Sequence, residues 1–367
     1  MFYWNIYPLL PRLVKIIIPI PKMRILVAPI SGGAFPIQLG FIVELAQAQH
    51  YPNQPFYDSI LASSGGNVAT YVALAGDFTL EGIERVCAKL HPNLFLSSWW
   101  PRPFASIFPS WILGYYAGSV FNCGIGIEKI FEELFTPTSI GRVEIWTGTL
   151  NRSTGKAELF TNLEPGESKL ALNHFSPDKL NTMPLTYLAR DRKMLSQVTY
   201  ASAAIPVLVP SVKINSVHYA DGGTCFSSPL TPLQGCITRA LQDQDNLHLD
   251  YLSSYDLGST SKPATYKNLL QNGGIALAEM IKSLGIQDRL SGIELLRAGE
   301  VKFDAGPCDA DILATIMTRR QGYRQSFLEL YPSKEIEINL EYFTAKDITK
   351  AIQEARKCMM YRLWYVE

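Results

Sequence analysis

Asp58-Ser-Ile-Leu-Ala-Ser-Ser-Gly-Gly66 is the stretch of sequence that decides the fold. An apolar strand enters a turn of small residues, and an Ala- and Val-rich helix follows at once. A small-x-Ser-x-Gly turn in this context predicts a nucleophile elbow, which presents a serine hydroxyl at a helix N-terminus, where the dipole favours negative charge. Ser64 is the predicted nucleophile rather than Ser63, because only Ser64 has small residues, Ala62 and Gly66, two positions away on both sides. The alternative interpretation is a glycine-rich loop that only turns the chain.

Two more glycine pairs follow predicted strands. Ser31-Gly32-Gly33 lies between a predicted strand over 24–30 and a predicted helix over 40–49. Its glycine amides are candidates for binding an oxyanion. A phosphate loop is the alternative, although the Lys-Ser/Thr of a Walker A sequence is missing. Asp221-Gly222-Gly223 follows a predicted strand over 217–220, and its glycines let the backbone pack close to another loop. The alternative there is an ordinary Asp-Gly turn.

The order of the predicted elements indicates an α/β fold. Strands and helices alternate along the chain, which implies a mostly parallel sheet with helices on both faces. Further strands are predicted over 57–62, 143–148, 156–160 and 247–253, and further helices over 80–90, around 127–134 and over 194–204. In the tail, Ile336, Ile338 and Leu340 alternate as in a strand, and Thr344 with Asp347 resembles a capping box. The helix predicted after it carries one apolar face, made of Ile348, Ala351, Ile352, Ala355 and Met359.

Four motifs in this order resemble the patatin-like phospholipase family, over roughly residues 24–255. The motifs are Ser31-Gly-Gly33, Asp58 to Gly66, Tyr200-Ala-Ser-Ala-Ala-Ile-Pro206 and Asp221-Gly-Gly223, which resemble the family's glycine-rich oxyanion loop, D-x-I-x-G-x-S-x-G elbow, A-S-x-A-x-P segment and D-G-G. The resemblance implies a three-layer α/β/α sandwich around a mostly parallel central sheet. It also implies a Ser–Asp dyad that cleaves acyl esters of lipids.

The resemblance assigns a role to each site residue. Ser64 is the expected nucleophile and Asp221 the expected general base and acid, while the amides of Gly32 and Gly33 form the expected oxyanion hole. The residues expected to support the motifs are Ala62, Gly65, Gly66, Gly222 and Gly223. Two positions depart from the family pattern, because Ala62 replaces the first elbow glycine and Phe35 or Pro36 stands where an Arg or Lys usually follows the glycine loop.

The expected activity is that of a lipid acyl hydrolase of the phospholipase A or lysophospholipase kind, which forms an acyl-enzyme and hydrolyses it. One alternative is a catalytically weak relative that binds lipid or a protein partner. A second alternative is an esterase with a Ser-His-Asp triad, because Ser64, Asp221 and His248 follow the chain order of such triads. However, His248 and His218 both lie within predicted strands, which favours structural roles for them.

Composition excludes several other classes of protein. Lys+Arg and Asp+Glu both number 33, so the formal net charge is zero. This argues against sequence-independent electrostatic binding of nucleic acid, which needs a basic surface. Hydrophobic residues make up 47% and charged residues only 18%, which predicts a large core or contact with membrane. The six cysteines form no C-x-x-C pair and the five histidines no i,i+4 pair, so we expect reduced thiols, an intracellular compartment, no metal and no cofactor.

The division predicted is an apolar leader over 1–22, a catalytic core over 23–255 and an extension over 256–367 packed on the same domain. The leader carries three cations, no acid and four prolines, and neither a signal peptide nor a membrane span is predicted in it. It is interpreted as a membrane-contacting tail, as a tail packed on the domain, or as a segment upstream of the true start. We expect a cytoplasmic protein that meets a membrane peripherally.

The stretch over 92–121 is dense in aromatic residues and almost uncharged. Trp and Tyr favour membrane interfaces, so this stretch is a candidate lid or acyl-chain channel that also touches the bilayer. Packing into the core is the equal alternative. The candidate lipid contacts are Trp99, Trp100, Phe104 and Trp111.

Overall fold

The computed structural model describes residues 23–48, 57–90, 132–133, 143–164, 166–167, 185–206, 209–240, 246–256, 269–296, 300–336 and 344–367. The leader over 1–22 and the candidate lipid contacts Trp99, Trp100, Phe104 and Trp111 lie outside these residues. The same holds for most of the helix predicted around 127–134 and for the tail strand predicted at 336–340, apart from Ile336.

Eleven strands of the described residues form one sheet. They are β1 (Met23–Ala28), β2 (Ser59–Ser63), β3 (Glu144–Asn151), β4 (Lys156–Thr161), β5 (Leu185–Tyr187), β6 (Val212–Ile214), β7 (Val217–Asp221), β8 (Leu247–Leu252), β9 (Lys302–Pro307), β10 (Gln325–Pro332) and β11 (Met359–Val366). The main order is β5-β4-β3-β2-β1-β8-β10-β11-β9, with β7 paired to β3 and β6 to β7. The central strands β3, β2, β1, β8 and β10 are parallel, and antiparallel pairs flank them on both sides.

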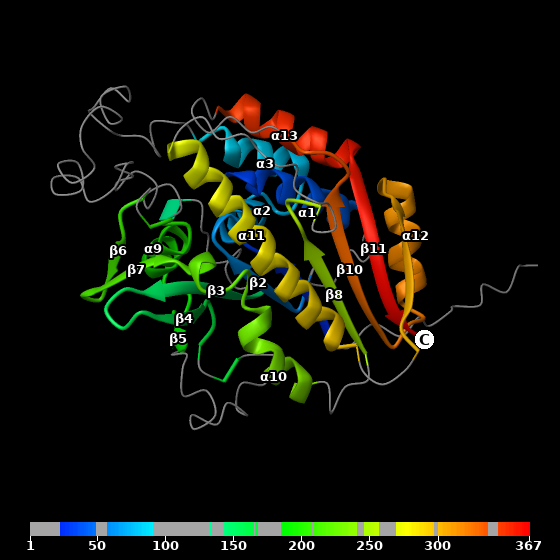
Figure 1. Cartoon of the computed structure of the whole chain (residues 1–367), viewed down its shortest axis with the longest axis horizontal. Coiled ribbons are helices and arrows are strands. Elements are labelled where there is room, and N and C mark those ends of the chain that lie inside the picture. Colours follow the sequence, from blue (N-terminus) through cyan, green and yellow to red (C-terminus); the bar gives the residue numbers. More distant parts are fainter. Residues whose placement is uncertain are drawn as a thin grey trace, which may run out of the picture.

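Helices cover both faces of this sheet. They are α1 (Phe35–Ala48), α2 (Gly65–Ala75), α3 (Leu80–Cys87), α9 (Arg192–Ser202), α10 (Leu230–Ala240), α11 (Leu269–Glu294), α12 (Ala310–Arg320) and α13 (Ala345–Lys357). α10 and α11 share one buried apolar cluster with the sheet, and the other helices contribute to the cluster on the opposite face. Figure 1 shows α11 crossing in front of the sheet, while α13 and α3 lie along the top of the view. The predicted three-layer α/β/α fold is confirmed.

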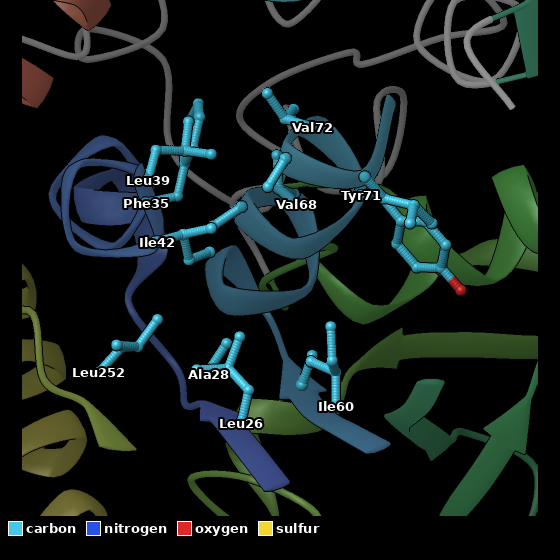
Figure 2. Close-up of a cluster of buried hydrophobic side chains, with 14 of the residues drawn as sticks. Leu26, Ala28, Phe35, Leu39, Ile42, Ile60, Val68, Tyr71, Val72 and Leu252 are labelled. Atoms are coloured by element: carbon cyan, nitrogen blue, oxygen red, sulfur yellow. The ribbon is translucent and has the colours of Figure 1, made fainter. Parts of the chain in front are cut away.

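The first strand shows why the chain takes this form. Every residue of β1 is buried, because helices cover both of its faces, and such strands are apolar throughout rather than alternating. Leu26 and Ala28 belong to one core cluster, whereas Ile25 and Val27 belong to the other. Figure 2 shows the first of these clusters, in which β1 meets side chains of α1 and α2.

The C-terminal strands extend the same sheet. β10 pairs with β8 in parallel, β11 pairs with β10 in the antiparallel sense, and β9 forms the far edge. The predicted capping box is confirmed, because the Thr344 side chain accepts from the Asp347 amide and the Asp347 carboxylate accepts from the Thr344 amide. The prediction for Met359 is wrong, since α13 ends at Lys357 and Met359 opens β11. Among the described residues, no helix has the length and apolar character needed to cross a membrane.

A close helix crossing ties the C-terminal α13 to α1. A Cβ atom on Gly40 would stand 2.8 Å from the Ile352 carbonyl oxygen and 3.0 Å from the Ala355 Cβ. We therefore expect Gly40→Leu to lower the free energy of unfolding by about 1–3 kcal/mol through overpacking. Gly235→Leu in α10 is the matched control, since a Cβ atom there has no atom of the described residues within 4 Å. Urea denaturation of both variants checks this, and an equal effect in the two would contradict the described packing.

Candidate active site

The elbow serine occupies a strained backbone conformation at a junction of two elements. β2 ends at Ser63, α2 begins at Gly65, and Ser64 between them has φ 55° and ψ −131°. A positive φ is costly for any residue with a Cβ, and such strain persists only where the surroundings fix it. Here the Ser64 carbonyl oxygen accepts from the amides of Asn67 and Val68, which anchors the turn to the first turn of the helix.

Two glycines allow the elbow to lie directly on the first strand and its loop. A Cβ on Gly66 would stand 2.1 Å from the Ala28 carbonyl oxygen, and one on Gly65 would stand 2.2 Å from the Gly32 carbonyl oxygen. No side chain fits at such distances from backbone atoms. The glycines therefore bring the Ser31-Gly32-Gly33 loop into contact with the elbow.

The register of β3 brings the acid to the same place. Ser63, the last residue of β2, pairs with Gly148, and Asp221, the last residue of β7, pairs with the next residue, Thr149. β2 runs parallel to β3 and β7 runs antiparallel to it, so the two strand ends meet head to head. Gly222 makes this meeting close, because a Cβ on it would stand 2.2 Å from the Gly148 carbonyl oxygen.

The two predicted catalytic side chains are in hydrogen-bond contact. The Ser64 Oγ donates to Asp221 Oδ2 at 2.6 Å, and the Gly223 amide donates to Asp221 Oδ1 at 2.6 Å. Ser64 and Asp221 are 0% and 1% exposed. Burial raises the pKa of Asp221 to about 7, an effect that the hydrogen bonds from Ser64 and Gly223 partly offset. A carboxylate with this pKa is a far better proton acceptor at neutral pH than an ordinary one.

The glycine loop presents unused donors beside the serine. Gly32, at φ 53°, opens a short 3-10 turn over Gly32–Ala34, and the Ala34 amide closes it on the Ser31 carbonyl oxygen. The amides of Gly32, Gly33 and Gly65 make no hydrogen bond within the described part of the chain. Gly65 is predicted from sequence only to support the motif, yet its amide, which follows Ser64 directly, is a third such donor. Such free amides suit an anion that forms during a reaction.

A family model described as patatin-like phospholipase matches residues 31–233, which is more than half of the chain and includes the elbow, the glycine loop and Asp221. The chain belongs to the patatin-like phospholipase family. Membership places it among lipid acyl hydrolases. No curated protein matches the chain.

Both candidates for the position of the expected Arg or Lys, Phe35 and Pro36, are uncharged and buried at the start of α1. Phe35 is the first residue of α1, is 5% exposed and belongs to the apolar cluster around α1 and α2. A hydrophobic ring packed in the core supplies no charge to the loop. Among the described residues of the loop, the donors without a hydrogen-bond partner are therefore uncharged: the amides of Gly32 and Gly33 and the Ser31 hydroxyl.

The structure does not bring His248 to Ser64. His248 lies at the start of β8, opposite Arg24 of β1, and its Nδ1 is 2.6 Å from Ser326 Oγ. The elbow lies past the other end of β1, and the four residue-to-residue steps from Arg24 to Ala28 span about 13 Å. Burial lowers the pKa of His248 well below its ordinary value. The described residues also contain no cluster of three His, Cys, Asp or Glu side chains that fits a metal ion.

The raised pKa of Asp221 makes a prediction for stability. The folded protein holds the Asp221 proton up to about pH 7, whereas the unfolded chain releases it near pH 4, so ionisation costs folding free energy as pH rises between these values. We expect Asp221→Asn to be more stable than the wild type at pH 8, by about 2–4 kcal/mol, and to lose this advantage near pH 4. Denaturant titrations at the two pH values check this. An advantage that does not change with pH would contradict the buried-carboxyl account.

Proposed function

We propose that the protein is a lipid acyl hydrolase of the phospholipase A type that cleaves fatty-acyl esters through Ser64 and Asp221. The observation that carries the proposal is the 2.6 Å hydrogen bond from the hydroxyl of a strained elbow serine to a buried carboxyl. The free amides beside it and membership of the family support the same chemistry.

The reaction begins when the Asp221 carboxylate accepts the proton of the Ser64 hydroxyl. The Ser64 Oγ attacks the ester carbonyl carbon, and the amides of Gly32, Gly33 and Gly65 stabilise the oxyanion that forms. Asp221 then gives the proton to the leaving alcohol, and Ser64 is left acylated. A water molecule that loses its proton to Asp221 attacks the acyl group, and Ser64 recovers its proton as the fatty acid leaves.

The substrate that we propose is a phospholipid or another acyl lipid at a membrane surface, with no cofactor. The aromatic stretch over 92–121 and the apolar leader motivate the membrane contact. A second candidate is a weakly catalytic lipid- or protein-binding relative, which is favoured because Phe35 or Pro36 stands where the glycine loop is expected to be followed by a cation.

Replacing the nucleophile separates the two candidates. We expect Ser64→Ala to lower kcat/KM for a p-nitrophenyl ester, and fatty-acid release from phosphatidylcholine vesicles, by about 10³-fold or more. Ser63→Ala is the matched control, because Ser63 is an equally buried neighbour whose hydroxyl has no hydrogen-bond partner in the described chain, and its rates should stay within about threefold. Equal rates for wild type and Ser64→Ala would exclude hydrolysis at this site.

The acid sets the expected pH profile. Because the base form of Asp221 is needed, kcat/KM should rise with pH and reach half of its plateau near pH 7. If His248 were the base, the rise of kcat/KM with pH would lie below pH 6.5, since burial lowers the pKa of His248. Asp221→Asn should abolish this rise with pH and most of the activity. His248→Ala, provided that it folds, should keep both. The opposite pattern in these two variants would favour the triad.

A further inference from the structure

The C-terminal end of α9 lies against the dyad. α9 packs on β3 and β7 and on α2, which carries the elbow. Its last residue, Ser202, is completely buried. It lies in the segment 200–206 that resembles the family's A-S-x-A-x-P motif. Its neighbours in the fold are the backbones of both halves of the site.

The Ser202 hydroxyl joins the elbow to the central strand. It accepts from the Ser64 amide at 3.0 Å and donates to the Gly148 carbonyl oxygen at 2.8 Å. Gly148 is the position of β3 at which β2 ends, just before pairing with β7 begins. The hydroxyl therefore bridges an interruption in the ladder, where the turn carries the Ser64 amide away from the strand.

The same short segment holds the other half of the dyad. The Ala204 carbonyl oxygen accepts from the Asp221 amide at 3.0 Å. Ala203 and Ala204 in turn donate to the carbonyl oxygens of Tyr200 and Ala201, which fixes the segment to the end of α9. One turn of chain thus binds the backbone of the nucleophile through a side chain and the backbone of the acid through a main-chain carbonyl.

We propose that Ser202 is a positioning residue that sets the hydrogen bond between Ser64 and Asp221. The proposal rests on the function proposed above. Without the hydroxyl, the buried Ser64 amide and Gly148 carbonyl lose a shared partner, and the strained elbow loses one of the contacts that fix it. Misplacement of a reacting group by about 1 Å costs about 100-fold in rate. Because the Ser202 hydroxyl is buried and its hydrogen bonds are to the backbone of Ser64 and Gly148, the loss should fall on kcat.

Three variants test the proposal. Ser202→Ala should lower kcat for a soluble p-nitrophenyl ester by about 10- to 100-fold with KM within about twofold, and should slow labelling of Ser64 by a fluorophosphonate to the same degree. Ser202→Thr keeps a hydroxyl and should recover most of this loss. Ser196→Ala is the matched control, since Ser196 is equally buried on the same helix but donates only to the Lys193 carbonyl oxygen. Its kcat should equal that of the wild type.

Hydrogen exchange of the Ser64 amide gives a readout that does not need activity. The amide should exchange slowly in the wild type and Ser196→Ala and at least 10-fold faster in Ser202→Ala, under conditions where circular dichroism shows all three folded. Rapid exchange in the wild type, or wild-type kcat and exchange in Ser202→Ala, would overturn the positioning role. Equal rates for wild type and Ser64→Ala would instead overturn the proposed function, and the exchange result would still decide the role of Ser202.

Discussion

The site depends on one feature of the sheet, the change of partner along β3 at Gly148 and Thr149. Up to Gly148 the edge of β3 pairs with the parallel strand β2, and from Thr149 it pairs with the antiparallel strand β7. Two strands that approach from opposite directions must both end at this point. The residue after one strand and the last residue of the other are then neighbours, and they are Ser64 and Asp221. The glycines around them are needed because three backbone segments share the space that side chains would otherwise occupy.

A serine hydroxyl bound to a buried carboxyl does not by itself define a site, as a second pair in this chain shows. Ser228 Oγ donates to Asp288 Oδ2 at 2.5 Å, and burial raises the pKa of Asp288, like that of Asp221, to about 7. Ser228 also accepts from the Leu230 amide, and Thr231 donates to Asp288 at 2.8 Å, so this pair caps the start of α10. Ser64 differs in its positive φ and in the neighbouring amides, which make no hydrogen bond within the described part of the chain. Strain and free donors, rather than the hydroxyl–carboxyl distance, distinguish the pair that we propose to be reactive.

Local patterns predicted the strands and helices around the elbow, and they missed the C-terminal strands β9, β10 and β11. β1 and β2 are apolar runs bounded by small residues, so their sequence alone identifies them. β10 contains the buried Glu329, whose carboxylate forms ion pairs with Arg289 and Arg362 from elsewhere in the chain. The charged residue interrupts the apolar run by which a buried strand is recognised from sequence. Met359 continues the apolar spacing of α13 but belongs to β11. Ser202 and Ser64 are 138 residues apart in the chain, so no local sequence pattern predicts the hydrogen bond between them.

The electrostatics of the site follow from the burial of its side chains. Asp221 has neither a cation nor a histidine beside it among the groups that shift its pKa, and burial is the largest of its causes. A cation near the carboxyl would lower this pKa and weaken the base. Phe35 and Pro36, the two buried candidates for the position of the expected Arg or Lys, leave the neighbouring loop equally uncharged. The described site thus keeps a strong base and neutral amide donors in a medium of low polarity, where each amide interacts more strongly with a developing oxyanion than it would in water. The same burial disfavours the ionised carboxylate in the resting protein. The free energy of unfolding is therefore lower at neutral pH than it would be with an uncharged side chain at position 221.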